Sequence, residues 1–346
     1  MMRKLLYMAS AVALVACGSS KETANTDNDV TTDQAAKYAK TITAKDLGKH
    51  LFIYASDEFE GRNTGEPGQK KAVKYLKDFY VSQGIASPLG GNDYFQEVPS
   101  EYLSNNRRGM TLKDSENVVA FIKGTEKPDE IVVISAHLDH EGVKNGEIYN
   151  GADDDGSGTV AILEIAEAFK QAADAGKGPK RSILFLHVTG EEKGLLGSKY
   201  YTENPIFPLA NTVADLNIDM IGRVDDRHKG NPNYVYLIGS DKLSTELHNI
   251  SEAMNKKYTN IDLDYKYNDD NDPNRFYYRS DHYNFAKHNI PIIFYFNGTH
   301  ADYHRPTDTP DKINYEMLEN RARLVFHTAW EVANRENRVV VDKAAE

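Results

Sequence analysis

Hydrophobic residues along the chain recur with two different periods, one typical of helices and the other of buried strands. Helical spacing extends over three segments, each long enough to cover one face of a sheet: Gln69–Gln83, Ser157–Lys170 and Tyr315–Asn334. Short continuous apolar runs predict buried strands at Asn117–Ile122, Ile131–Ser135, Ser182–Val188, Thr212–Ile218, Tyr234–Ile238 and Pro291–Phe296.

The alternation of these elements predicts an α/β fold, in which helices flank a mostly parallel, mixed central sheet in three layers. The strands Asn117–Ile122 and Ile131–Ser135 are expected to be neighbours, joined by a turn through Gly124 and Pro128. The polar stretch Lys256–Tyr278 has poor periodicity and is expected to form a long loop over the functional site. Without a convincing boundary, the pattern predicts one domain over residues 41–346.

The amino terminus has a different composition from the rest of the chain. Basic residues at positions 3 and 4 precede the apolar stretch Leu5–Val15, which is the build of a signal peptide over residues 1–16. The sequence Leu-Val-Ala-Cys ending at Cys17 resembles the lipobox of bacterial lipoproteins. Residues 17–40 are rich in small polar residues and are expected to form a flexible tether.

These features predict an exported bacterial lipoprotein whose membrane contact is made only through lipidated Cys17. Gly18 follows this cysteine, and the absence of aspartate there favours the outer membrane, facing the periplasm or the cell surface. Cys17 is the only cysteine, so internal disulfides are excluded. The formal net charge of −11 argues against nucleic acid as a partner, because binding phosphates requires a basic surface.

Candidate metal ligands follow the predicted strands at their carboxyl ends. His137, the pair Glu191-Glu192 and Asp219 each come directly after one strand, and His304 lies beyond the last one. Ligand sites in open α/β sheets gather at this edge. Imidazole and carboxylate groups are the side chains that bind zinc, so their shared placement predicts a metal site.

The motifs that contain these residues occur in a characteristic order. They read HLDH, GADDDGSG, GEEKGLLGS, NIDMIGR and YHRPTDT, and an upstream segment reads SDEFEGRNTGEPGQKKAVKYL. Together they resemble the zinc aminopeptidases of peptidase family M28 over about residues 45–335. No sizeable insertion fits between Gly84 and Asn117, so the chain is similar to the compact bacterial members.

The resemblance implies two zinc ions per chain. Asp154 would bridge them, His137 and Asp219 would complete the first site, and Glu192 and His304 would complete the second. A carboxylate between two cations offsets their mutual repulsion, and two ions together lower the cost of generating hydroxide. In this family the peptide bond between Asp154 and Asp155 is typically cis.

The resemblance also implies three catalytic roles. Glu191 would be the general base that moves a proton from the bridging water to the leaving amine. Asp139, two residues after His137, would accept the free imidazole N–H. Tyr303 would stabilise the oxyanion, although Tyr277 and Tyr278 remain alternatives for this role.

Other histidines compete for the ligand positions. His300 is the rival of His304, but the following Pro306, Thr307 and Asp308 fit the family pattern better when His304 is the ligand. His140 is expected at the rim of the pocket in a non-ligand role. The segment Arg279–His282 is expected to support or pack against the site.

The resemblance implies an exopeptidase that removes N-terminal residues from peptides with a free amino group. A carboxypeptidase or an amino-acid deacylase is an alternative, because relatives with those activities share the dinuclear core. A glutaminyl cyclase is less favoured, since those relatives use one zinc ion. A non-catalytic binding or receptor domain is a further alternative, although such proteins usually lack ligands that this chain retains. The sequence leaves the oligomeric state open.

Overall fold

The structure, a computed structural model, describes residues 34–104, 109 and 111–343. The expected signal peptide and Cys17 lie outside the described residues and stay predictions. The tether expected over residues 17–40 is wrong at its carboxyl end, because residues 34–39 are helical. Tyr38 is buried there, and its ring stacks on Trp330 at a centroid distance of 6.1 Å. This aromatic contact fixes the segment against the domain.

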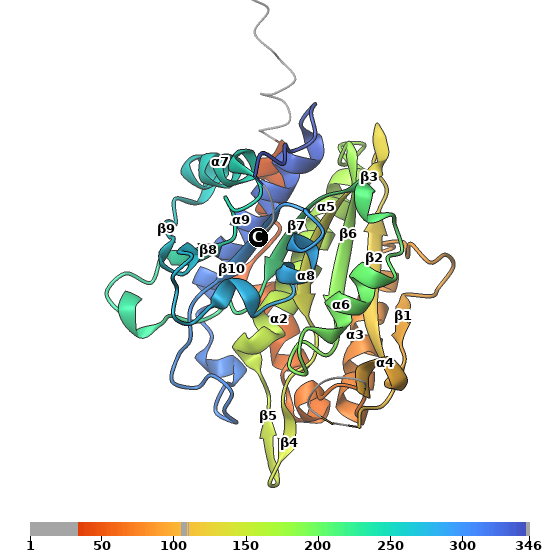
Figure 1. Cartoon of the computed structure of the whole chain (residues 1–346), viewed down its shortest axis with the longest axis vertical. Coiled ribbons are helices and arrows are strands. Elements are labelled where there is room, and N and C mark those ends of the chain that lie inside the picture. Colours follow the sequence, from red (N-terminus) through yellow and green to blue (C-terminus); the bar gives the residue numbers. More distant parts are fainter. Residues whose placement is uncertain (1–33, 105–108, 110, 344–346) are drawn as a thin grey trace, which may run out of the picture.

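One sheet forms the centre of the described structure, and it has eight strands in the order β1-β2-β6-β3-β7-β10-β8-β9 (Figure 1). Their bounds are β1 Phe95–Val98, β2 Ser115–Ile122, β3 Lys127–His137, β6 Arg181–Val188, β7 Thr212–Ile218, β8 Tyr234–Ile238, β9 Asp262–Asp264 and β10 Ile292–Phe296. Strands β4 (Gly142–Lys144) and β5 (Glu147–Tyr149) form a separate hairpin beyond the end of β3.

The centre of the sheet is parallel, and antiparallel pairs flank it. Strands β6, β3, β7 and β10 pair in parallel, whereas β1 with β2, β2 with β6, and β10 with β8 are antiparallel. This arrangement confirms the expected mixed central sheet. Because the four parallel strands end at the same edge, the loops that follow them meet there.

The expectation that β2 and β3 are neighbours is wrong, because β6 lies between them. The turn that joins β2 to β3 crosses the beginning of β6 and hydrogen-bonds to it. The backbone N–H of Gly124 donates to Ser182 Oγ at 2.9 Å. A Cβ atom at Gly124 would lie 2.4 Å from the carbonyl oxygen of Lys180, so only glycine permits this crossing.

Helices cover both faces of the sheet. They are α2 Ala44–Tyr54, α3 Pro67–Ser82, α4 Ser100–Ser104, α5 Gly158–Asp174, α6 Leu196–Glu203, α7 Thr245–Met254, α8 His282–Ala286 and α9 Tyr315–Asn334. Along β3, Val132 and Ile134 join the core beneath α5 and α9, while Ile131 and Val133 join the core on the opposite face, which α6 and α8 cover. None of the described helices is long and apolar enough to cross a lipid bilayer.

The segment Lys256–Tyr278 is mostly irregular, as expected, but it also extends the sheet. Within it, β9 pairs in parallel with β8. The segment then returns toward the carboxyl edge, where Phe276 is buried and Tyr278 reaches a surface pocket.

A buried arginine connects α9 to the loops that carry the carboxyl edge. The guanidinium group of Arg321 is almost fully buried and donates hydrogen bonds to four backbone carbonyl groups. The acceptors belong to Ile221, Arg223, Pro232 and Tyr234. The side chain therefore satisfies polar groups along the connection from β7 to the start of β8.

We expect Arg321→Ala to lower the free energy of unfolding by about 3 kcal/mol, because it leaves buried carbonyl groups without donors. Lys74→Ala is a suitable control, since that side chain forms an exposed ion pair with Asp78. It should change stability by less than about 0.5 kcal/mol. Denaturant unfolding of both variants measures the difference, and equal stability would contradict the role given to Arg321.

Candidate active site

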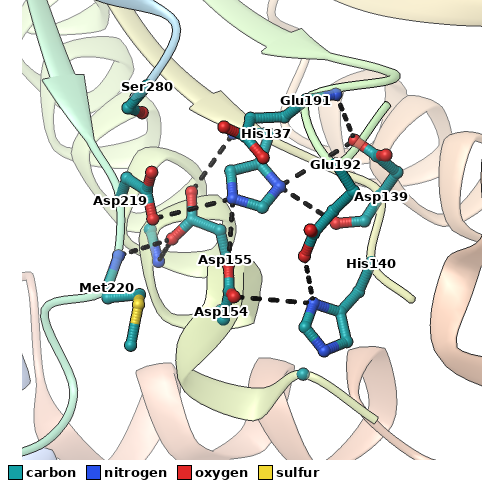
Figure 2. Close-up of polar contacts among 12 residues, drawn as sticks. His137, Asp139, His140, Asp154, Asp155, Glu191, Glu192, Asp219, Met220 and Ser280 are labelled. Carbon is teal, nitrogen blue, oxygen red and sulfur yellow. Dashed lines mark hydrogen bonds and ion pairs between the residues drawn. The ribbon is translucent and has the colours of Figure 1, made fainter. Parts of the chain in front are cut away.

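Side chains from four loops at the carboxyl edge meet in one hollow (Figure 2). His137 is the last residue of β3, Asp219 follows β7 directly, and Glu191 and Glu192 follow β6. His304 lies in the loop after β10. The parallel strands thus bring together residues that lie as far as 167 positions apart in the sequence.

Asp154 lies between two groups of side chains and faces both. Its Oδ1 is 3.1 Å from His137 Nε2, which is itself 3.6 Å from Asp219 Oδ1. Its Oδ2 is 3.0 Å from His304 Nε2, which is 3.5 Å from Glu192 Oε2. One carboxylate therefore faces both groups, which is the position that the family resemblance implies for a bridging ligand.

Several nitrogen and oxygen atoms of these groups lack the hydrogen-bond partners that buried polar atoms normally have. His137 Nε2, Asp154 Oδ2 and Glu192 Oε1 are buried and make no hydrogen bond. Leaving such atoms unpaired is costly, whereas cations bound in the two groups would satisfy them. Nitrogen and carboxylate oxygen atoms fit divalent zinc, and three sets of residues have ligand atoms close enough to share an ion: His137, Asp154 and Asp219; His140, Asp154 and Glu192; and Glu141, Glu192 and His304.

The electrostatics of the first group also favour positive charge. Burial lowers the pKa of His137, but the carboxylates of Asp154 and Asp219 outweigh it and raise this pKa well above its usual range. The same surroundings that would hold an imidazolium ion would hold a metal cation.

The backbone that carries Asp154 is held from two sides. Asp308 Oδ2 accepts hydrogen bonds from the backbone N–H groups of Asp153 and Asp154, at 2.9 and 3.2 Å. The carboxylate of Asp155 accepts from the N–H groups of His137 and Met220, each at 3.1 Å. The peptide bond between Asp154 and Asp155 is cis, as the family resemblance implied. These contacts join the ends of β3 and β7 to the loop that carries Asp154.

The expected contact between Asp139 and the ring of His137 differs in the structure. His137 Nδ1 donates to the backbone carbonyl oxygen of Asp139 at 3.0 Å, whereas the Asp139 carboxylate is 3.8 Å away. The carboxylate accepts instead from the backbone N–H of Glu191 and from Thr64 Oγ1. The carbonyl comes closer because the chain turns between residues 137 and 139. Asp139 therefore positions Glu191, while its backbone orients the imidazole.

Glu191 stands beside both groups but belongs to none of the three possible metal-ligand clusters found in the described residues. Burial raises the pKa of its carboxyl group well above the usual range, and the carboxylates of Glu192 and Asp219 add to this effect. Its backbone is held by Asp139 at 3.1 Å. A held carboxyl group whose pKa is raised well above its usual range is suited to taking up and releasing a proton.

A pocket of about 560 Å³ opens beside these groups. Its walls are formed by Glu141, Glu191, Glu192, Gly194, Leu195, Tyr278, Arg279, Tyr303 and His304. The ring of Tyr303 stacks on His304 at a centroid distance of 3.9 Å, so this tyrosine lies at the site. Tyr278 reaches the same pocket, and both remain candidates for stabilising an oxyanion.

These features agree with the comparison to known sequences. The model of peptidase family M28 matches residues 117–329, which is more than half of the chain. The chain belongs to peptidase family M28.

Individual members of the family and solved structures support this assignment. Leupeptin-inactivating enzyme 1 of Streptomyces exfoliatus is 26% identical over 303 residues, covering 81% of this chain and 59% of that protein. The chain thus spans just over half the length of this relative. The LapA aminopeptidase of Legionella pneumophila superposes with a TM-score of 0.66 and 22% identity, covering 88% of this chain and 76% of that one. An aminopeptidase from Aneurinibacillus sp. strain AM-1 gives a TM-score of 0.64 and 18% identity, covering 90% and 100%. These structural matches show the M28 fold.

The structure separates the histidines that compete for the M28 ligand positions. His300 Nε2 lies 3.1 Å from Asp153 Oδ2, away from Asp154, whereas His304 lies against Asp154 and Glu192. His282 packs on Phe294 outside the metal groups.

Four residues of the site do more than the sequence indicated. Asp308 and Asp155 hold the bridging loop, and both occur in the family-like motifs. His140, expected at the rim, is fully buried and lies against Glu192. Arg279, expected to support or pack, lies in the pocket wall with its guanidinium over the ring of Phe276.

We expect Asp308→Ala to weaken metal binding by about 10- to 100-fold, because it frees the backbone that carries Asp154. Competition against a chromophoric chelator measures this affinity. Asp311→Ala, at an exposed position on the same loop, serves as the control. Unchanged affinity in the Asp308 variant would show that the bridging loop holds its geometry without this carboxylate.

Proposed function

We propose that this M28 protein is an aminopeptidase that removes N-terminal residues from peptides with the help of two zinc ions. The observation that carries the proposal is the Asp154 carboxylate, which faces two groups of unpaired donor atoms at once. His137, Asp154 and Asp219 would hold one ion, and Asp154, Glu192 and His304 the other. When bound, the two ions supply Lewis-acid activation of the scissile carbonyl and of the attacking water.

Glu191 supplies the proton transfer in this proposal. Its carboxylate takes up a proton from the attacking water and passes it to the nitrogen of the leaving amine. The hydrogen bond from its backbone N–H to Asp139 fixes the position of the residue during both steps. The hydroxyl of Tyr303 or Tyr278, in the same pocket, donates to the oxygen of the tetrahedral intermediate.

The charge of the pocket supports a substrate with a free amino group. Glu191 and Glu192 both line it, and their carboxylates attract a peptide ammonium group. The Legionella and Aneurinibacillus structures described above are both called aminopeptidases.

One observation favours the carboxypeptidase alternative. Arg279 lines the same pocket, and a guanidinium group is well suited to binding a substrate carboxylate. A deacylase that acts on N-acylated amino acids would use the same contact. A non-catalytic binding domain is disfavoured, because all five expected metal-binding side chains are present. Glu191, whose carboxyl group has a raised pKa, lies beside them.

We also propose that the chain is attached to a membrane through lipidated Cys17, on the strength of its signal-peptide-like amino terminus. Mass spectrometry of the purified protein tests this: a diacylglyceryl adduct on Cys17 supports the proposal, and an unmodified or absent Cys17 overturns it.

We expect Glu191→Gln to lower kcat by about 10²- to 10⁴-fold while bound zinc stays unchanged, because the amide cannot accept the proton. Hydrolysis of an aminoacyl-anilide and elemental analysis measure the two quantities. Glu58→Gln, at an exposed position remote from the pocket, should retain full activity. Normal turnover in the Glu191 variant would rule out this residue as the base.

Substrates with blocked ends separate the alternatives. An aminopeptidase should cleave peptides with an amidated carboxyl end and reject N-acetylated ones. A chelator should abolish hydrolysis whichever blocked substrate is cleaved. Cleavage of N-acetylated substrates and rejection of amidated ones would establish the carboxypeptidase or deacylase alternative instead, provided that Arg279→Ala loses this activity. Chelator-resistant hydrolysis would contradict the metal-dependent mechanism as a whole.

A further inference from the structure

His140 is a fully buried histidine whose ring has no hydrogen-bond partner. Its exposed fraction is 0%, and neither Nδ1 nor Nε2 makes a hydrogen bond. A buried imidazole in that state is costly, and the function proposed above gives it no role.

The ring points into the second group of donor atoms (Figure 2). His140 Nδ1 lies 2.9 Å from Glu192 Oε1 and 3.8 Å from Asp154 Oδ2. The contact with Glu192 is short but lacks hydrogen-bond geometry at both atoms, since each remains unpaired. Short, poorly aligned contacts of this kind are what neighbouring ligands of one cation make.

The distances agree with a shared cation. Two ligand atoms at about 2.1 Å from one zinc ion, in tetrahedral geometry, lie about 3.4 Å apart. The contacts of His140 Nδ1 at 2.9 and 3.8 Å bracket this value. His304 makes contacts of 3.0 and 3.5 Å with the same two carboxylates. The two histidine rings, with centroids 5.8 Å apart, therefore approach one pair of carboxylates.

The surrounding backbone holds the His140 ring in place. A Cβ atom on Gly151 would lie 2.4 Å from His140 Cγ, so the ring packs directly on the backbone of this glycine. Arg62, which is fully buried, donates to the carbonyl groups of Gly151 and Leu138 on either side. The position of the ring is thus built into the fold and does not depend on solvent.

We propose that His140 is a fourth protein ligand of the second metal site, together with Asp154, Glu192 and His304. The proposal rests on the two-metal function above. It makes the sites unequal: the second has two imidazoles and two carboxylates, and the first has one imidazole and two carboxylates. A site with four protein ligands is closed, whereas one with three keeps an open position. The second site therefore fills first and releases its zinc last.

Another carboxylate near this site does not explain the geometry as well. Glu141 offers an oxygen near Glu192 and His304, but it is paired with Lys144. The ammonium group offsets the charge of Glu141 and competes with a cation for its oxygen atoms. His140 has no such competitor among the described residues.

The rival explanation is that His140 Nδ1 donates a hydrogen bond to Glu192 and only positions it. His140→Asn distinguishes the two roles, because the asparagine amide can still donate from the position of Nδ1 but is a poor zinc ligand. His50→Asn is the matched control, since His50 Nε2 lies 3.5 Å from Glu164 Oε1, remote from the site.

The experiment measures zinc affinity of the full chain by competition with a chromophoric chelator, and the visible spectrum of the Co²⁺-loaded protein. We expect the original chain to bind one ion more tightly than the other. His140→Asn should weaken the tight site by at least about 100-fold and change its Co²⁺ spectrum, whereas His50→Asn changes neither. Tight binding with an unaltered spectrum in His140→Asn overturns the proposal in favour of a positioning role.

A measurement on the original chain keeps the test valid even if the variant fails to fold. X-ray absorption of the zinc-loaded protein counts imidazole ligands: three shared by two ions with His140, and two without it. A count of two overturns the inference and leaves the aminopeptidase proposal standing. Failure to bind any divalent ion would contradict the two-metal function itself, so the two failures are distinguishable.

Discussion

Negative charge that the protein itself does not neutralise is the constraint around which this active site is built. Asp154, Asp219 and Glu192 lie together, and none of them forms an ion pair with lysine or arginine among the described residues. Histidine rings are their nearest partners, and a buried carboxylate cluster of this kind is stable only if protons or metal cations balance it. The fold therefore supplies a cluster whose charge must be balanced by protons or cations.

The sheet holds these charged residues together, because its rigid strands end close to the residues that carry the charge. Strands β3, β6, β7 and β10 are parallel neighbours, so their following loops share one edge. A further layer of carboxylates holds the backbone of that edge. Asp155 joins β3 to β7, Asp139 holds Glu191, and Asp308 holds the bridging loop. The acidic motifs therefore contain two kinds of aspartate: Asp154 and Asp219 face the cluster, whereas Asp139, Asp155 and Asp308 hold its backbone.

Most of the sheet could be predicted from the sequence, because buried strands appear there as short apolar runs separated by polar loops. The neighbour relation of β2 and β3 could not, since strand order depends on a turn crossing β6 and not on any local pattern. Short elements such as β4 and β5 could not be predicted either, because little of them is buried and they therefore lack a hydrophobic pattern.

The site was predictable as a set of residues and less so in its contacts. The motif order identified the residues that converge, including His304 in preference to His300. It did not show that the carbonyl group of Asp139, and not its carboxylate, accepts from His137, because that depends on the local backbone. Nor did it show that His140 is fully buried, because the direction of its ring depends on the backbone that surrounds it.

The stacking of Tyr38 on Trp330 fixes where the described chain starts relative to the active site. Trp330 lies near the end of α9 that approaches the beginning of β6, where Arg181 donates to the carbonyl of Val332. The described chain thus starts at the pole opposite the catalytic edge (Figure 1). The mouth of the pocket, at the carboxyl edge, therefore opens at the end of the molecule that is far from the start of the described chain.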